Sequence, residues 1–240
     1  MQRFKPIFVF VICVFIAILI ALTELFDITY IHIHGNNSMT NEQVLNSLEK
    51  ENSNIFLFNR FRAMTNLQSN LHVYTSTVTK DYINRQINVN IIERVQIAYI
   101  RFAYGSYLRI DRNGFVMSTT DTVEHNAPVI TGLNLTSFFL GDYLSAVNSQ
   151  TLYIISRFAE IFLAYDVDPF LVTVDPTDLN NIRLVYGQIV VNLGDSLNLA
   201  EKFRIFLSVT AIPDIYVHRY AGGQLNITNI YRNWTFNLLT

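Results

Sequence analysis

The chain contains 240 residues, of which 50% are hydrophobic and 15% are charged, and its formal net charge is −2. These values exclude an intrinsically disordered chain, which has low hydrophobicity and high net charge, and they argue against a nucleic-acid-binding protein, which carries a basic surface. The single cysteine excludes an internal disulfide and a cysteine-based zinc site.

The N-terminal segment is the most apolar part of the chain. Sixteen consecutive apolar residues run from Ile7 to Leu22. They span about 24 Å at about 1.5 Å per residue, and continuation to Phe26 reaches the roughly 30 Å of a bilayer core. Because basic residues precede this run and acidic residues follow it, the positive-inside rule leaves the N-terminus in the cytoplasm. We predict a cytoplasmic tail over 1–6 and an uncleaved transmembrane helix over 7–26, with the remaining chain exported.

Two alternatives exist for this segment. A cleaved signal peptide would have a shorter apolar region followed by a small-x-small cleavage site, and the residues from Leu22 to Phe26 offer no convincing site. A buried helix of a soluble domain would explain the apolar run but not the one-sided basic flank. The anchor therefore explains more of the pattern than either alternative.

The next segment has a β-α-α-β-β pattern. A strand is predicted over Ile28–His34, and the capping-box pair Thr40 and Gln43 predicts the start of a helix. A second short helix is predicted near Arg60–Ser69. Two strands then follow, over Leu71–Lys80 and Gln86–Arg94. In the second strand apolar residues alternate with asparagines, which indicates a sheet with one buried face.

A second module with several strands follows. The Asn-Gly pair within Asp111–Gly114 predicts a hairpin with a type I′ turn. Apolar residues at three- and four-residue spacing predict a long helix over 143–164, and another helix is predicted from Leu197. Three short strands are predicted between these helices, over 171–174, 182–186 and 189–193.

Aromatic and aliphatic residues are concentrated near the C-terminus. The candidate partner-binding residues are Tyr216, Tyr220, Leu225, Ile227, Tyr231, Trp234 and Phe236. They could be ordinary sheet residues that cover a core. They would also suit an open sheet edge with aromatic anchors, to which a partner adds a strand.

A series of short motifs occurs in a fixed order along the chain. The motifs are Ile31-His-Ile-His-Gly-Asn36, Ser38-Met-Thr-Asn-Glu-Gln-Val44, Asn54-Ile-Phe-Leu57, Val78-Thr-Lys80, Ile87-Asn-Val-Asn-Ile-Ile-Glu93, Leu108-Arg-Ile-Asp111-Arg-Asn-Gly114, Pro128-Val-Ile-Thr-Gly132 and Val190-Val-Asn-Leu-Gly194. In order and spacing they resemble the bacterial cell-division family FtsQ/DivIB. The segment Ile215–Tyr220 stands in the place of that family's Asp-Leu-Arg-Tyr strand, from which it departs at Val217 and His218.

The resemblance implies an α+β fold in three parts. These are an N-terminal transmembrane helix, a POTRA domain of β-α-α-β-β order over 27–95, and a second mixed α/β domain over 96–240. The sheet of the second domain is expected to be extended and mostly antiparallel.

The resemblance also implies a function. A member of this family is a non-catalytic divisome scaffold, essential for septum formation, that is held in the inner membrane at the division septum and links early division proteins to septal peptidoglycan synthesis. Its last strands receive FtsB, so FtsB and FtsL are the expected partners there, and other divisome proteins are expected at the POTRA domain and the membrane helix. No cofactor, metal, nucleic acid or small-molecule substrate is expected.

Few residues of the sequence are candidates for catalysis or metal binding. No serine-hydrolase elbow, Walker loop or dinucleotide fingerprint is present in the sequence. A metal at His32 and His34, and catalysis by the pair Glu93 and Arg94, are both less favoured than solvated or ion-paired roles. For the acidic group, turn and cap roles are favoured over calcium binding; it comprises Asp166, Asp168, Asp175 and Asp178. The alternative function is a membrane-anchored, peptidoglycan-processing envelope enzyme, which would need a cleft with convergent titratable residues.

Overall fold

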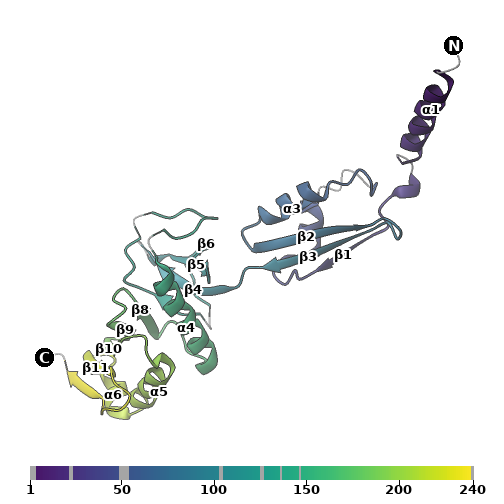
Figure 1. Ribbon diagram of the computed structural model, residues 1–240. Helices are drawn as coiled ribbons and strands as arrows, with labels where there is room; N and C mark the ends of the chain where they lie inside the picture. Colours follow the sequence, from purple (N-terminus) through teal and green to yellow (C-terminus); the bar gives the residue numbers. More distant parts are fainter. Residues whose placement is uncertain are drawn as a thin grey trace. The chain divides into compact units, whose positions relative to one another are not determined.

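The computed structural model describes residues 4–21, 24–48, 54–102, 105–124, 127–135, 137–145 and 147–238. The chain forms two compact units, Met1–Arg94 and Val95–Thr240 (Figure 1). Each unit has its own hydrophobic core.

The N-terminal helix differs from the prediction. Helix α1 covers Phe4–Ala21, and Glu24–Phe26 form a separate 3-10 turn, η1, so residues 7–26 are not one continuous helix. The helical part of that range rises about 22 Å, less than the roughly 30 Å of a bilayer core. Within the described residues, no helix combines the length and apolar content that crossing a membrane requires. The predicted transmembrane helix is therefore wrong, and residues 1–3 of the predicted tail lie outside the described residues.

The first unit continues in the predicted β-α-α-β-β order. Its elements are β1 (Tyr30–His34), α2 (Asn41–Ser47), α3 (Arg60–Gln68), β2 (Val73–Asp81) and β3 (Gln86–Glu93). The three strands form a sheet in the order β1-β3-β2, with β1 parallel to β3 and β2 antiparallel to it. Figure 1 shows α3 lying over this sheet.

One face of the first sheet carries the core. Ile87, Val89 and Ile91 of β3 are buried and pack with apolar residues of α2 and α3, as their alternation with asparagines predicts. The Thr40 hydroxyl accepts from the Gln43 N–H while the Gln43 side chain accepts from the Thr40 N–H, so the predicted capping box is confirmed.

The second unit contains a nine-stranded sheet among the described residues, in the order β12-β11-β10-β9-β8-β7-β4-β5-β6. Its strands are β4 (Gln96–Arg101), β5 (Tyr107–Asp111), β6 (Val116–Thr120), β7 (Val129–Ile130), β8 (Val172–Asp175), β9 (Ile182–Tyr186), β10 (Ile189–Gly194), β11 (Gly223–Asn226) and β12 (Thr235–Leu238). Its helices are α4 (Ser149–Tyr165), α5 (Leu199–Thr210) and α6 (Pro213–His218). Most neighbouring strands are antiparallel, but β7 is parallel to both of its neighbours and β11 is parallel to β10.

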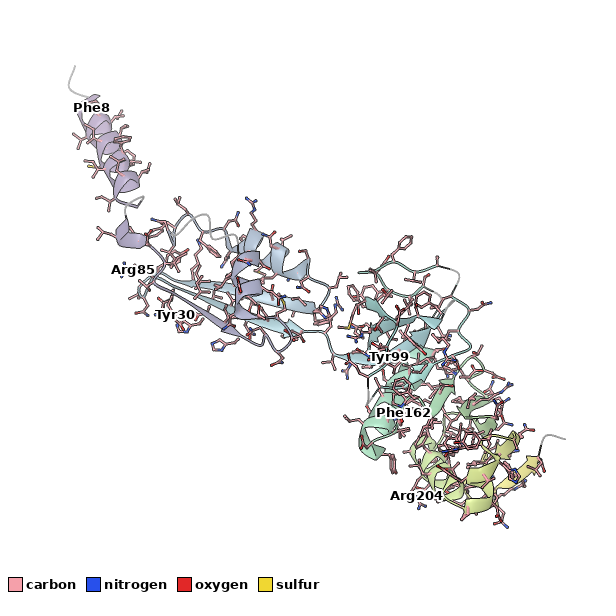
Figure 2. The ribbon with its side chains drawn as sticks, turned by 180° about the vertical axis from the view of Figure 1, so that it is seen from behind. Phe8, Tyr30, Arg85, Tyr99, Phe162 and Arg204 are labelled. Carbon is pink, nitrogen blue, oxygen red and sulfur yellow. The ribbon has the colours of Figure 1, made fainter. Side chains whose placement is uncertain are left out.

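The core of this unit lies between the sheet and helices α4 and α5. Phe158 and Phe162 of α4 and Phe203 and Phe206 of α5 are completely buried, and Figure 2 labels Phe162 within this part of the chain. A smaller cluster around Tyr99 covers the other face of β4, where the Tyr99 hydroxyl accepts from the Glu124 N–H at 3.0 Å.

Two local predictions in the second unit are wrong. Helix α4 starts at Ser149 instead of residue 143, because the Asn148 side chain caps its first turn by accepting from the Thr151 N–H at 2.8 Å. The hairpin turn is not type I′, since Asn113 lacks the positive φ that this turn needs at both central positions. Instead, the Asp111 carboxylate accepts from the N–H groups of Asn113 and Phe115, and only Gly114 is left-handed.

The segment Ile215–Tyr220 is not a strand. This corrects its alignment with the family's Asp-Leu-Arg-Tyr strand, which the resemblance suggested. It falls in α6 and the turn after it. Pro213 starts this helix at a position where a backbone N–H would have no hydrogen-bond partner within the helix. Asp214 is an acidic residue in the first turn and His218 a basic residue in the last turn, and these residue types are favoured there. The strand that continues the sheet is β11, which follows Gly222.

Candidate functional site

The last two strands form one edge of the second sheet. Strand β11 lies parallel to β10, and β12 returns antiparallel to β11. Figure 1 shows β12 in yellow near the C-terminus. Within the described residues no strand pairs with the outer side of β12, so this side is an open edge.

Part of the β12 backbone faces this open side. The Ile227 N–H donates to the carbonyl of Asn192 next to β11, at 2.8 Å. Since amide direction alternates along a strand, Leu225 also faces β10, and it lies opposite Phe236 in β12. The backbone groups of Phe236 and Leu238 therefore face away from β11. They can form hydrogen bonds with an added strand.

The seven predicted partner-binding residues occupy three environments. Leu225 and Ile227 are buried in the core, so they cannot contact a partner and can only pack beneath the exposed residues. Phe236 is half-buried. The other four are exposed: Tyr216 at 44%, Tyr220 at 73%, Tyr231 at 88% and Trp234 at 39%. The exposed residues lie on α6 and in the turns before and after β11.

Phe236 attaches β12 to the rest of the unit. Its ring lies 5.7 Å from that of His218 at the end of α6. It also covers Gly223, where an added Cβ would lie 2.5 Å from the Phe236 Cζ. Phe236 therefore holds the edge strand in place, which leaves Trp234 and Tyr231 as the exposed aromatic residues near the edge.

Arg219 is a prominent residue of this region that the sequence reasoning missed. Its guanidinium lies 4.0 Å from the ring centre of Tyr216 and 4.6 Å from that of Tyr220, and it donates to the Tyr220 hydroxyl. Hydrogen bonding to Tyr186, opposed by desolvation, raises the pKa of Arg219 above its ordinary value. A possible signal in the sequence was an arginine adjacent to one tyrosine and three residues from another.

A groove of about 290 Å³ lies beside Arg219. It is lined by Phe170, Leu171, Tyr186, Gly187, Arg219 and Tyr220. Gly187 has a φ of +59°, and an added Cβ there would lie 2.6 Å from the Arg219 carbonyl oxygen. That oxygen accepts from the Gln188 N–H at 2.8 Å, so a tight glycine turn joins the β9–β10 hairpin to the end of α6.

The first unit has a separate groove of about 460 Å³. Its lining includes Phe56, Phe61 and Tyr82, with Arg60 and Lys80 as cations. Desolvation, together with the nearby Arg60 charge, lowers the pKa of Lys80, whose Nζ donates to the Ile55 carbonyl at 2.7 Å. On the same unit Arg85, labelled in Figure 2, donates from Nη1 to the Leu25 carbonyl at 2.9 Å.

The other candidate residues, the possible catalytic pair Glu93 and Arg94 and the possible metal ligand His32, make local structural contacts. The Glu93 carboxylate accepts from the N–H groups of Ser38 and Met39, and the Arg94 guanidinium lies 5.3 Å from the ring centre of Tyr74. The His32 Nε2 is 3.1 Å from the Gln86 side-chain oxygen.

The acidic group consists mainly of turn residues. Asp168, Asp175 and Asp178 each accept from the N–H two residues later, and Asp166 ends α4 in the left-handed conformation. Among the described residues no three His, Cys, Asp or Glu side chains converge as metal ligands would.

Comparison with known proteins identifies relatives of both units. Residues 26–94 match the domain family described as "POTRA domain, FtsQ-type". The "Cell division protein DivIB" of Clostridium tetani (strain Massachusetts / E88) is 25% identical over 186 residues, which cover 77% of this chain and 69% of that protein. The proteins of the same name from Clostridium botulinum strains Hall and Loch Maree are each 22% identical over 210 residues, covering 87% of this chain and 81% of those proteins.

Proposed function

Because the chain belongs to the FtsQ/DivIB family of cell-division proteins, we propose that it is a non-catalytic scaffold of septum formation that docks FtsB, together with FtsL, along β12. In this role it acts at the division septum and links early division proteins to septal peptidoglycan synthesis. Its work is binding and positioning of partners.

The open edge of β12 is the observation that supports the docking site. An added strand would form hydrogen bonds with the outward backbone groups of Phe236 and Leu238, which provide affinity for any extended peptide. Trp234 and Tyr231 flank the edge and are exposed, so they can contact side chains of the partner and provide selectivity. Edge strands of this kind otherwise promote unwanted association, which a bound partner prevents.

The first unit offers a second surface for other division proteins. Its groove combines exposed aromatic rings with the cations Arg60 and Lys80, and it is formed without any residue of the second unit. We assign the partners other than FtsB and FtsL to this unit.

A proline at the open edge tests the docking site. Leu238→Pro removes the outward N–H, whereas Leu238→Ala keeps this N–H and removes only the side chain. We expect Leu238→Pro to weaken binding of purified FtsB by at least about tenfold, the effect of losing one or more hydrogen bonds at an interface. The alanine control should bind within about threefold of the wild type.

Binding is measured by titration calorimetry, and circular dichroism establishes that both variants are folded. Equal affinity of the proline variant and the wild type would show that FtsB does not add a strand to β12. Loss of binding in both variants would instead point to the Leu238 side chain.

A further inference from the structure

We propose that the groove of the first unit binds an extended acidic segment of a division protein other than FtsB and FtsL. The inference rests on the proposed function, which assigns such partners to this unit, and it adds the chemistry of the segment. Residues 56–61, Lys80 and Tyr82 line the groove. In this site Arg60 and Lys80 hold carboxylates of the segment, and the aromatic rings pack against an apolar side chain beside them.

Phe56 and Tyr82 form an aromatic wall of the groove, which Phe26 supports. The Phe56 ring stacks with Tyr82 at a ring-centre distance of 5.5 Å and packs edge-on with Phe26 at 4.9 Å. The Ile55 N–H donates to the Phe26 carbonyl at 2.9 Å, which fixes the loop that carries Phe56. Phe56 and Tyr82 are still 48% and 53% exposed. Because the wall is already ordered, covering it with a partner costs little conformational entropy.

Arg60 and Lys80 supply positive charge that no carboxylate offsets among the described residues. The Arg60 guanidinium lies 4.7 Å from the ring centre of Phe61, and the Lys80 ammonium donates to the Ile55 carbonyl at 2.7 Å. Burial and the nearby Arg60 charge both lower the pKa of Lys80. A carboxylate in the groove would attract both cations and counter their repulsion.

The placement of Lys80 favours a peptide over a flat anionic surface. Lys80 is half-buried, and its Nζ lies 5.8 Å from the ring centres of both Phe58 and Tyr82. A carboxylate on a side chain can project into the groove toward this ammonium, whereas a layer of lipid headgroups would meet the exposed Arg60 first. Since side chains two positions apart share one face of an extended chain, we expect an acidic residue two positions from an apolar one in the segment.

The experiment probes the full chain with short overlapping peptides that cover the division proteins of the same bacterium other than FtsB and FtsL. Peptides with the acidic and apolar residues at this spacing should bind. The tightest binder is then made with glutamine, and separately with lysine, in place of its acidic residues, and fluorescence polarisation measures each affinity. Glutamine replacement should weaken binding by at least about tenfold, as for the loss of a charge-assisted hydrogen bond.

Variants of the groove have matched controls on the same unit. Arg60→Gln and Lys80→Gln should each lower the affinity for the acidic peptide by about tenfold. Arg62→Gln makes the same change in net charge on α3 but outside the groove lining, so it should bind within about threefold of the wild type. Tyr82→Ala should weaken binding, whereas Tyr74→Ala removes a ring of similar exposure, 52%, outside the lining and should not. Circular dichroism establishes that each variant is folded.

A charge reversal tests direct contact between Arg60 and the peptide. Arg60 is exposed at the first helical position of α3, where a glutamate is also favoured, so Arg60→Glu should fold. This variant should lose affinity for the acidic peptide and recover at least about tenfold with the lysine peptide, because opposite charges are again apposed. Absence of recovery would exclude the contact with Arg60.

The outcomes separate this inference from the proposed function. If no acidic peptide binds, or if the Arg60 and Lys80 variants bind it like the wild type, the inference is wrong, while the FtsB titration of Leu238→Pro still decides the β12 site. If these variants instead lose affinity for vesicles of phosphatidylglycerol and phosphatidylcholine, and no peptide binds, the groove contacts lipid and the inference is again wrong. Loss of peptide binding in both variants, with unchanged affinity for FtsB, supports it.

Discussion

At the scale of single residues, Glu93 connects the end of β3 to the loop before α2. Its carboxylate accepts from the Ser38 N–H at 2.8 and 3.0 Å, from the Ser38 hydroxyl at 2.7 Å and from the Met39 N–H at 3.1 Å. Although desolvation opposes the effect, these hydrogen bonds hold the pKa of Glu93 below its usual range. A residue that could have been part of a catalytic pair is thus occupied in fixing a loop.

Replacing Glu93 with glutamine should destabilise the first unit by about 1–2 kcal/mol at pH 7, because the loop donors then bond a neutral acceptor. The lowered pKa means that the carboxylate contributes stability above the ordinary pKa of about 4.3, and this contribution is lost as the pH falls through the lower folded-state pKa. The difference between wild type and Glu93→Gln in urea unfolding should therefore shrink as the pH falls from about 5 to 3. A difference that is constant over this range would exclude a charge effect.

Lys202 is a buried cation with one carboxylate partner. Its side chain is 3% exposed, and its Nζ lies 2.8 Å from the Asp195 Oδ1 and 2.9 Å from the Asp195 carbonyl. The hydrogen bond from Lys202 lowers the pKa of Asp195, whose side chain is 50% exposed. The pair connects α5 to the turn after β10.

Substitutions of Asp195 and Lys202 should destabilise the second unit by different amounts. Asp195→Ala leaves a buried ammonium without its carboxylate and should cost about 2 kcal/mol, less than for a fully buried pair because Asp195 is half exposed. Lys202→Met removes the charge while filling the same space and should cost less than about 1 kcal/mol. Urea unfolding of both variants measures the difference. A larger loss for Lys202→Met would show that the ammonium contributes more than its burial costs.

At the scale of elements, the end of α4 carries local strain. Asp166 has φ 49° and ψ 50°, the left-handed conformation that glycine adopts most readily at this position. A negative charge is also unfavourable at the C-terminal end of a helix. Both effects arise from the backbone of the helix and not from distant contacts.

Asp166→Gly should therefore stabilise the second unit by about 0.5–1 kcal/mol, whereas Asp166→Asn should recover only the electrostatic part. Thermal unfolding of the three proteins tests this expectation. If Asp166→Gly lowers the melting temperature, the entropy that glycine adds to the unfolded chain outweighs the relief of strain.

The elements also show where local patterns were sufficient. Strand β3 and helix α2 were predictable, because alternating apolar residues and a capping box determine local structure directly. Helix α6 was not, since Ile215, Tyr216 and Val217 favour a strand and only Pro213 indicated a helix start. In the candidate site, the aromatic C-terminal segment was predictable from the sequence. The position of Arg219 and the groove beside it were not, because they depend on contacts between distant segments.

At the scale of the whole molecule, each unit has a separate core. The core of the first unit draws on residues from Ile28 to Ile91, and the main core of the second draws on residues from Ile97 to Phe236. Residues 26–94 and 95–240 should therefore each fold as isolated fragments, since neither core needs residues of the other unit.

Only the 95–240 fragment should bind FtsB, with an affinity within about threefold of the full chain. Circular dichroism and titration calorimetry of the two fragments measure folding and binding. Binding by the 26–94 fragment would move the FtsB site to the first unit.

The amino-acid sequence by itself determined the local structure of this protein: the alternating strands, the capped helices and the aromatic C-terminal segment, because each depends on neighbours in the chain. The tertiary structure decided that α6 is a helix and that β12 forms the open edge beside Arg219. Strand order and groove geometry depend on hydrogen bonds between residues far apart in sequence, such as that between Gln188 and Arg219. Local patterns contain no record of those pairings.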